Sequence, residues 1–230
     1  MQLDLVKYLT ERVADDEAKA SRLGPVITIS REYGCPSKII ACSLVEELSK
    51  KISLKGTTTE WKVVTKEILW ESARELQVDP AMIKLVFNNE RRGLFDSVLF
   101  AQHDKYYKSD KKIRNTIAKV IRNMAKEGHV IIVGRGGVAI TRDIPASLHI
   151  MLKAPLEWRV ARISESYKIP VPEARKTAIA IDNQRKEFRE SFKGKDNDYT
   201  WFDLTINCMT LSVAEIVNII ANAAAIKNLV

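Results

Sequence analysis

Residues 26–30 read Val-Ile-Thr-Ile-Ser, and residues 31–36 continue as Arg-Glu-Tyr-Gly-Cys-Pro. The first run is short, apolar and rich in β-branched side chains, which is typical of a buried strand. The second run contains glycine and proline and therefore predicts a turn. After the turn, Ile40, Leu44 and Leu48 recur at four-residue spacing, which predicts a helix. The unit is thus a strand, a turn and a helix.

The same alternation of strand and helix continues along the chain. Further strands are expected from apolar runs at 61–64, 129–133, 148–152 and 202–206. Helices are expected at 4–20, 68–76, 109–128 and 173–192, from Pro80, after Pro155 and at 213–226. This order predicts an α/β fold with a parallel sheet covered on both faces. Such sheets bind ligands at the carboxyl ends of their strands, so the turns after Ser30 and Val133 and the helix after Leu152 are the expected site.

The composition of the chain limits the classes of protein to which it can belong. The chain has 230 residues, of which 46% are hydrophobic, enough for one well-buried domain. It contains no apolar run of about 18 residues, so no membrane span is expected. Its charged start does not fit a signal peptide, and we expect a cytoplasmic protein. Cys35, Cys42 and Cys208 form no CxxC motif, which argues against a disulfide framework or a zinc site.

The net charge of +8 allows two interpretations. It is either an ordinary solvated surface or the mark of a partner that carries phosphate, whether a nucleotide or a nucleic acid. The chain has no helix-turn-helix, RNA-recognition or zinc-finger pattern. Nucleic-acid binding is therefore the least favoured function, and no nucleic acid is expected as a partner.

The turn after the first strand lies between a strand and a helix, as a phosphate-binding loop does, but its residues depart from the usual sequence of such a loop. The usual pattern is G-x-x-x-x-G-K-[ST]. Arg31 and Pro36 stand where the two glycines belong, Ser37 replaces the lysine, and Lys38 replaces the metal-binding hydroxyl. Pro36 has no N–H group, so the loop loses one anion donor. The turn is either a plain connection or an altered phosphate loop with Gly34, in which Lys38 reaches the phosphates and Arg31 adds a cation.

Four segments in this order resemble the cytidylate kinase-like family. They are Ile29–Pro36, Val130–Gly137, Ala154–Arg162 and Phe202–Asn207, and the likeness extends over about residues 25–220. The family is similar to nucleoside monophosphate kinases. The resemblance implies a P-loop-type three-layer fold with a five-stranded parallel sheet. It also implies an N-terminal extension (1–24) and a kinase-like domain (25–230), with a helical insert (about 57–108) and a lid (about 165–200).

The resemblance further implies transfer of a phosphoryl group from ATP, with Mg²⁺, to a nucleoside monophosphate. The catalytic residues implied are Lys38, Arg135, Arg159, Arg162 and Arg185. The ATP-binding residues implied are Arg31, Gly34, Cys35, Ser37 and Lys38, with Ser37 as the metal ligand. The substrate-binding residues implied are Arg135, Asp182 and Arg189. Gly136 stands where cytidylate kinases carry an acidic residue that reads cytosine, so specificity for cytosine does not follow.

Physical chemistry supports arginines in these roles. Phosphoryl transfer needs positioning and charge neutralisation more than covalent chemistry, and guanidinium groups match phosphate oxygens. Pairs such as Arg185 and Arg189 also occur on ordinary solvated helices. Arg135 follows a buried strand inside a glycine turn, where an arginine without a function is less expected. We therefore expect a kinase. The alternative is a nucleotide-binding or regulatory protein without turnover, which the altered loop favours.

Overall fold

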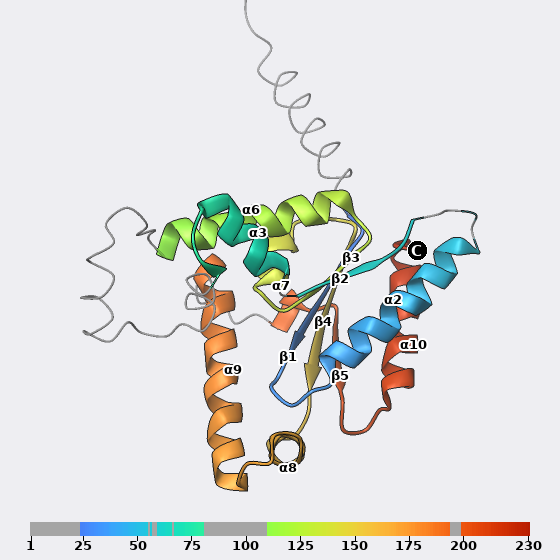
Figure 1. Ribbon diagram of the computed structural model, residues 1–230. Coiled ribbons are helices and arrows are strands. Elements are labelled where there is room, and N and C mark those ends of the chain that lie inside the picture. The colour runs from blue at the N-terminus through green and yellow to red at the C-terminus, as the bar shows by residue number, and fades with distance from the viewer. Residues whose placement is uncertain (1–23, 55, 57–58, 66, 81–109, 194–198) are drawn as a thin grey trace, which may run out of the picture.

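The computed structural model of the protein describes residues 24–54, 56, 59–65, 67–80, 110–193 and 199–230 (Figure 1). These residues include a five-stranded sheet in the order β2-β3-β1-β4-β5, with every pairing parallel. The strands are β1 (Val26–Arg31), β2 (Lys62–Val64), β3 (Val130–Val133), β4 (Ser147–Lys153) and β5 (Leu204–Asn207). The predicted α/β fold with a five-stranded parallel sheet is confirmed.

Strand β1 lies at the centre of the sheet, and this explains its composition. Val26 is in register with Val130 of β3 on one side and with Ser147 of β4 on the other. Ile27 and Ile29 are fully buried in one apolar cluster, while Val26 belongs to the cluster on the opposite face. A strand covered on both faces needs apolar side chains in both directions, which is why the run is not alternating.

Two helical layers cover the sheet. Helices α2 (Ser37–Ser53) and α10 (Val213–Ile226) pack on one face, and α3 (Glu67–Leu76), α6 (Asp110–Glu127) and the short α7 (Gly137–Thr141) pack on the other (Figure 1). The first layer is buried through residues such as Leu44 and Ile220, and the second through Ile68 and Ile117. Apart from the short α7, each of these helices contributes the apolar stripe that its sequence predicts.

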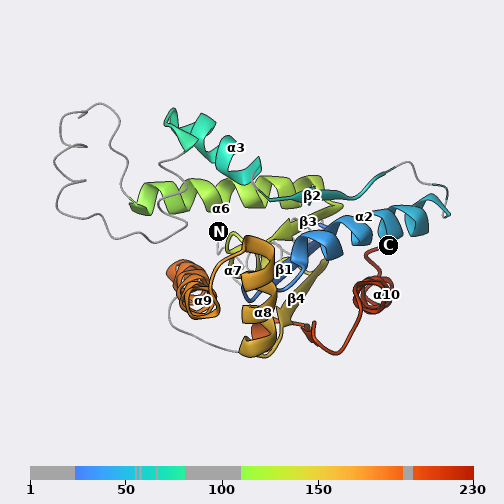
Figure 2. The same cartoon turned by 60° about the horizontal axis from the view of Figure 1, so that its bottom comes forward.

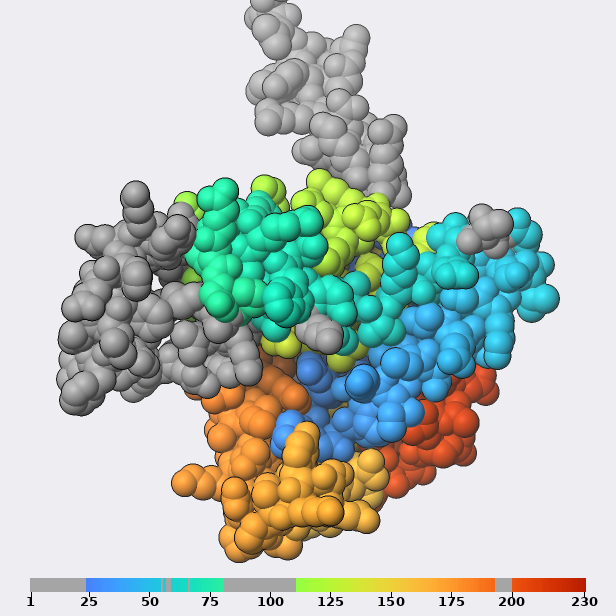
Figure 3. Space-filling view, in the orientation of Figure 1, coloured from blue at the N-terminus to red at the C-terminus, as the bar shows by residue number. Residues whose placement is uncertain are grey.

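Helices α8 (Leu156–Tyr167) and α9 (Val171–Lys193) lie beside each other at the carboxyl ends of the strands (Figure 2). A short 3₁₀ turn (Tyr199–Trp201) precedes β5. In Figure 3 the segment around the end of β1, in blue, is exposed at the surface. It lies between α9, in orange, and α2, in lighter blue. The expected functional edge of the sheet is therefore accessible between the loop after β1 and helix α9.

Some expectations differ from the structure or lie outside it. The turn after Val133 leads directly into α7, a five-residue helix that the sequence did not predict, and β5 begins at Leu204, two residues later than expected. The predicted helix 4–20 and most of the insert at 57–108 lie outside the described residues. The boundaries of extension, insert and lid remain predictions. Among the described helices, none is long and apolar enough to cross a membrane.

Candidate functional site

The loop after β1 uses much of its own hydrogen-bonding capacity internally. The N–H of Cys35 donates to the carbonyl of Glu32 at 3.3 Å, and the N–H of Ser37 donates to the carbonyl of Cys35 at 2.8 Å. Pro36 precedes α2 without a side-chain cap and has no N–H to offer. A standard phosphate loop directs such N–H groups at the ligand. This loop therefore presents fewer backbone donors than its position in the fold suggests.

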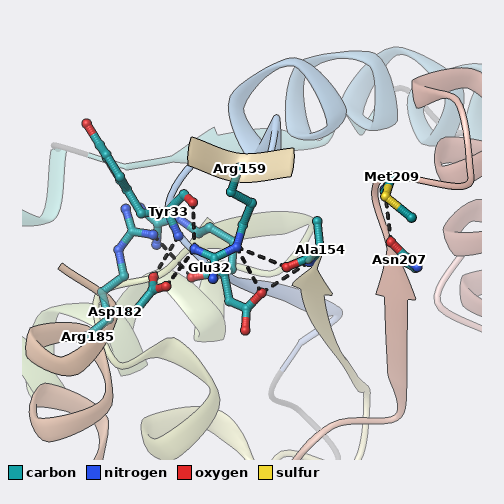
Figure 4. Close-up of polar contacts among 9 residues, drawn as sticks. Glu32, Tyr33, Ala154, Arg159, Asp182, Arg185, Asn207 and Met209 are labelled. Carbon is teal, nitrogen blue, oxygen red and sulfur yellow. Dashed lines mark hydrogen bonds and ion pairs between the residues drawn. The ribbon is translucent and has the colours of Figure 1, made fainter. Parts of the chain in front are cut away.

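Arg159 of α8 clamps this loop in place (Figure 4). Its side chain is 7% exposed, and Nε donates to the carbonyl of Ala154 at 3.0 Å. Nη1 donates to the carbonyl of Tyr33 at 2.9 Å and to Asp182 Oδ2 at 2.7 Å. The other Asp182 oxygen accepts the N–H of Tyr33 at 2.7 Å, and the Glu32 carboxylate lies 3.3 Å from Arg159 Nε. We call this set the Arg159 clamp; it joins the loop to α8 and α9.

Four arginines converge on a cavity of about 340 Å³ at the carboxyl ends of β1 and β3. They are Arg31 at the end of β1, Arg135 after β3, and Arg185 and Arg189 on α9, and we call this space the arginine cavity. Burial, together with the positive charges of Arg185, Arg135 and Arg189, lowers the pKa of Arg31 to about 9. Burial likewise lowers the pKa of the other three guanidinium groups.

The charge balance of the arginine cavity favours an anion. A pKa of about 9 leaves Arg31 charged at neutral pH, so the cavity holds several cations together. None of the described residues that line it is acidic. From outside this lining, negative charges oppose the lowering of two of these pKa values: Asp182 acts on Arg185, and Glu190 and Asp182 act on Arg189. They offset part of the positive charge. Because like charges in a partly dry space repel, a phosphate group that enters would relieve an unfavourable interaction.

Gly134 allows Arg31 to reach this position. A Cβ at Gly134 would lie 1.8 Å from Arg31 Nη1, and the glycine has a φ of +74°. Neither the space nor the backbone conformation suits another residue. The glycine turn after β3 therefore makes room for the guanidinium group of the neighbouring strand.

We expect Gly134→Ala to displace Arg31 and to weaken phosphate binding. The matched control is Gly56→Ala, because Gly56 has a similar φ of +79° but nothing within 4 Å of its Cβ position. In both variants an alanine must adopt the left-handed backbone conformation, which lowers the free energy of unfolding by about 1 kcal/mol. Only Gly134→Ala should also raise the dissociation constant for inorganic phosphate, measured by calorimetry. Equal phosphate affinity in the two variants would contradict this role of Gly134.

A second, smaller cavity of about 230 Å³ adjoins the loop itself. The lining residues that matter here are Gly34, Cys35 and Ser37 from the loop, Arg162 and Tyr167 from α8, and again Arg31 and Arg185. We call it the loop cavity. The ring of Tyr33 stacks on that of Tyr167, with centroids 6.2 Å apart, and Arg185 lies over Tyr33 at 5.4 Å. The two cavities thus share Arg31 and Arg185.

The structure sorts the predicted site residues into four groups. Those at the arginine cavity are Arg31, Arg135, Arg185 and Arg189, and those at the loop cavity are Gly34, Cys35, Ser37 and Arg162 together with Arg31 and Arg185. Arg159 and Asp182 line neither cavity and belong to the clamp. Lys38 is exposed on α2 and lines neither cavity. A role for Lys38, Arg159 or Asp182 in direct contact with phosphate therefore has no support in this geometry.

Three residues of α9 at the arginine cavity were not predicted, although their spacing in the sequence carries a signal. Ile181, Gln184 and Phe188 line the arginine cavity with Arg185 and Arg189. Their spacing of three, four, seven and eight residues is that of one helix face. Applying this periodicity to 173–192 would have identified the whole face of α9 that covers the site.

A larger cavity, of about 980 Å³, lies elsewhere. It adjoins α3, α6 and the starts of β2 and β3, and Glu67, Glu71 and Glu75 are among its lining residues. Carboxylates repel phosphate, and parallel sheets bind ligands at their opposite, carboxyl end. The two smaller, basic cavities are the better candidates for the functional site.

Comparisons with known proteins show which proteins this chain is similar to in sequence and fold. A cytidylate kinase of Methanocaldococcus jannaschii is 30% identical over 125 residues, which cover 53% of this chain and 70% of that protein. A cytidylate kinase of Staphylothermus marinus is 34% identical over 113 residues, covering 49% of this chain and 63% of that one. A solved structure, an uncharacterized protein from Eubacterium ventriosum, has the same fold, with a TM-score of 0.61 and 20% identity over 87% of this chain and 97% of its own.

The match to a family model covers more of the chain than the match to either cytidylate kinase. Residues 26–210 match the model of the cytidylate kinase-like family, from the start of β1 to just beyond the end of β5. That span contains the loop after β1, the glycine turn after β3 and both helices that carry the arginines. The chain belongs to the cytidylate kinase-like family.

Proposed function

We propose that the protein transfers the γ-phosphoryl group of ATP to a nucleoside monophosphate. The observation that carries the proposal is that two adjacent cavities share Arg31 and Arg185. The acceptor's phosphate would occupy the arginine cavity and the donor's phosphates the loop cavity. The phosphoryl group would then pass beside the two shared guanidinium groups, where its charge is neutralised throughout the transfer.

Residues of the loop cavity fit a magnesium ion in this reaction. Mg²⁺ prefers oxygen ligands, and it is usually bound by one or two protein oxygens and the phosphates of the substrate. Ser37 offers a hydroxyl group and Glu32 a carboxylate, and both line the loop cavity. Bound there, the ion would neutralise charge on the donor phosphates. Arg162, also at this cavity, would orient them.

The experiment is a transfer assay with all common ribonucleoside and deoxyribonucleoside monophosphates, in the presence of ATP and magnesium. We expect at least one of them to be phosphorylated. Cytosine need not be preferred, because Gly136 at the start of α7 packs against Phe188 and Phe192 and leaves no room for a side chain that reads the base. A panel without turnover would contradict the proposal.

The second candidate is nucleotide binding without turnover, and the loop geometry favours it. Tyr33, Cys35 and Ser37 direct their N–H groups at protein acceptors rather than at a ligand. The exposed Lys38 cannot replace them at the donor phosphates without moving.

For this candidate we expect ATP or a monophosphate to raise the melting temperature while the transfer panel stays empty. At a ligand concentration about 100 times the dissociation constant, binding adds about 2.7 kcal/mol of stability. In a protein of this size each kcal/mol raises Tm by about 2–4 °C. Potassium chloride at equal ionic strength is the control. A thermal shift accompanied by turnover would instead select the kinase.

A further inference from the structure

The loop after β1 binds a carboxylate that belongs to helix α9. Asp182 Oδ1 accepts the N–H of Tyr33 at 2.7 Å, and Asp182 Oδ2 accepts a hydrogen bond from Nη1 of Arg159 at 2.7 Å (Figure 4). Carboxylate and phosphate oxygens accept the same kinds of hydrogen bond from backbone N–H and guanidinium groups. Asp182 therefore occupies donors that suit a phosphate oxygen equally well.

The N–H of Tyr33 differs from two neighbouring donors of the loop. The N–H groups of Cys35 and Ser37 donate to carbonyls within the loop, so they belong to its own fold. The N–H of Tyr33 instead donates to an anion on another element, and Tyr33 lines the loop cavity. A backbone N–H between a strand and the following helix is the kind of donor that binds phosphate. Of these three donors, the N–H of Tyr33 is the one that a ligand can take over.

The loop itself is held in place independently of Asp182. The N–H and the carboxylate of Glu32 are hydrogen-bonded to the end of β4 and to the residue after it, at 3.0 Å and 3.1 Å. A Cβ at Gly34 would lie 3.0 Å from the Cβ of Arg159, so the loop also packs closely against α8. Because the loop is fixed, the N–H of Tyr33 changes its partner when the side chain of Asp182 turns away.

Asp182 can turn away because Arg159 has a second counter-ion. The side chain of Asp182 is 22% exposed, so it borders solvent, and rotation about χ1 moves its carboxylate without a change in the backbone. After such a rotation the carboxylate of Glu32 still lies 3.3 Å from Nε of Arg159. The buried guanidinium group keeps a charged partner, which avoids the large penalty of an unpaired buried charge.

The charge of Asp182 also opposes the binding of anions nearby. Asp182 counteracts the lowering of the pKa of Arg185 and of Arg189, so its negative charge lies within electrostatic reach of both guanidinium groups. Arg185 lines the arginine cavity and the loop cavity. A phosphate group that enters either cavity therefore meets positive charge that Asp182 already neutralises in part.

We propose that Asp182 is an internal competitor of the donor phosphates. Its carboxylate and a phosphate oxygen compete for the N–H of Tyr33. As ATP enters the loop cavity, the phosphate oxygen takes this donor and Asp182 turns towards solvent. The contact is autoinhibitory, and it sets the affinity of the loop for phosphate. The identity of ATP as the displacing ligand rests on the proposed function, whereas the competition applies to any polyphosphate.

The test is the affinity for inorganic tripolyphosphate, measured by calorimetry at constant ionic strength. Asp182→Asn keeps the shape of the side chain and an acceptor oxygen for the N–H of Tyr33, but it removes the charge. We expect the dissociation constant to fall about tenfold relative to the parent, because the amide oxygen is a weaker acceptor and does not repel the incoming anion.

The matched control is Glu187→Gln, which removes one negative charge from an exposed position of the same helix that lines neither cavity. It should change the dissociation constant less than about twofold, because solvent and salt screen an exposed charge. An equal or higher dissociation constant in Asp182→Asn would mean that Asp182 only holds the loop in its binding conformation. That result would overturn the proposal.

A measurement on the parent protein covers the case in which Asp182→Asn folds poorly. When tripolyphosphate is added, the amide resonance of Tyr33 in heteronuclear NMR should shift, because its acceptor changes from a carboxylate to a phosphate. If the amide resonance of Tyr33 stays in place while those of Gly34 and Cys35 shift, the ligand binds without displacing Asp182 and the proposal is wrong.

The transfer assay separates this proposal from the proposed function. Tighter binding of tripolyphosphate by Asp182→Asn, in a protein that transfers no phosphoryl group, would support the competition and contradict the kinase. Turnover by the parent, with tripolyphosphate bound no more tightly by Asp182→Asn, would support the kinase and refute the competition. If both proposals hold, Asp182→Asn should also lower the KM for ATP.

Discussion

Replacing Arg31 with alanine is expected to reduce kcat/KM for phosphoryl transfer by about 10²–10³-fold. That is the usual loss when one preorganised donor is removed from a developing charge. Arg31 lines both cavities and reaches its position through the space above Gly134. Its removal should therefore weaken the interactions with the phosphates of both ATP and the acceptor monophosphate. Steady-state kinetics with varied ATP and varied monophosphate would measure the effect.

The control is Lys38→Ala, which we expect to leave kcat/KM close to that of the parent, because Lys38 is exposed and lines neither cavity. A second readout separates catalysis from folding. Arg31→Ala should not lower the free energy of unfolding, because it removes a partly buried cation that Arg185, Arg135 and Arg189 repel. If Lys38→Ala abolishes transfer and Arg31→Ala does not, the donor phosphates lie elsewhere.

Replacing Arg159 with alanine is expected to lower the free energy of unfolding by about 3 kcal/mol. Breaking a buried ion pair typically costs about 3–5 kcal/mol, because the remaining charge loses its partner. The lower end applies because the side chains of Asp182 and Glu32 are 22% and 25% exposed. The substitution also removes donors to the carbonyls of Ala154 and Tyr33. Urea denaturation monitored by circular dichroism would measure the change.

Arg74→Ala is the matched control for this prediction. Arg74 also pairs with a carboxylate, that of Glu71, but the two side chains are 79% and 40% exposed. A surface pair of this kind contributes about 0–1 kcal/mol. Arg159→Lys should recover only part of the loss, because an ammonium group cannot reproduce the planar fork of contacts. A loss below about 1 kcal/mol in Arg159→Ala, comparable to a surface pair, would mean that the clamp does not stabilise the fold.

The fold was predictable because its strands differ in composition from everything around them. Val26–Ser30 and Val130–Val133 are apolar runs bounded by turn residues, and the helices between them carry clear apolar stripes. Their alternation determines a parallel sheet and therefore the edge at which ligands bind. Helix α7 was missed because a five-residue helix after a glycine turn leaves too little sequence for periodicity to be detected.

The site was predictable only in part, because side-chain direction depends on contacts between distant segments. Arg135 stood out because it follows a buried strand in a glycine turn. Arg159 and Arg162 looked equivalent in sequence, yet one is buried against Asp182 and the other faces the loop cavity. No pattern in the sequence indicates that the side chain of Asp182 contacts the loop after β1.

A crystal structure with a bound nucleoside monophosphate tests the central claim most directly. We expect its phosphate to lie in the arginine cavity and to contact the guanidinium groups of Arg31, Arg135 and the arginines of α9. The backbone N–H groups of Cys35 and Ser37 should keep their bonds within the loop. A phosphate bound by those N–H groups beside Lys38, with the arginine cavity empty, would contradict the account.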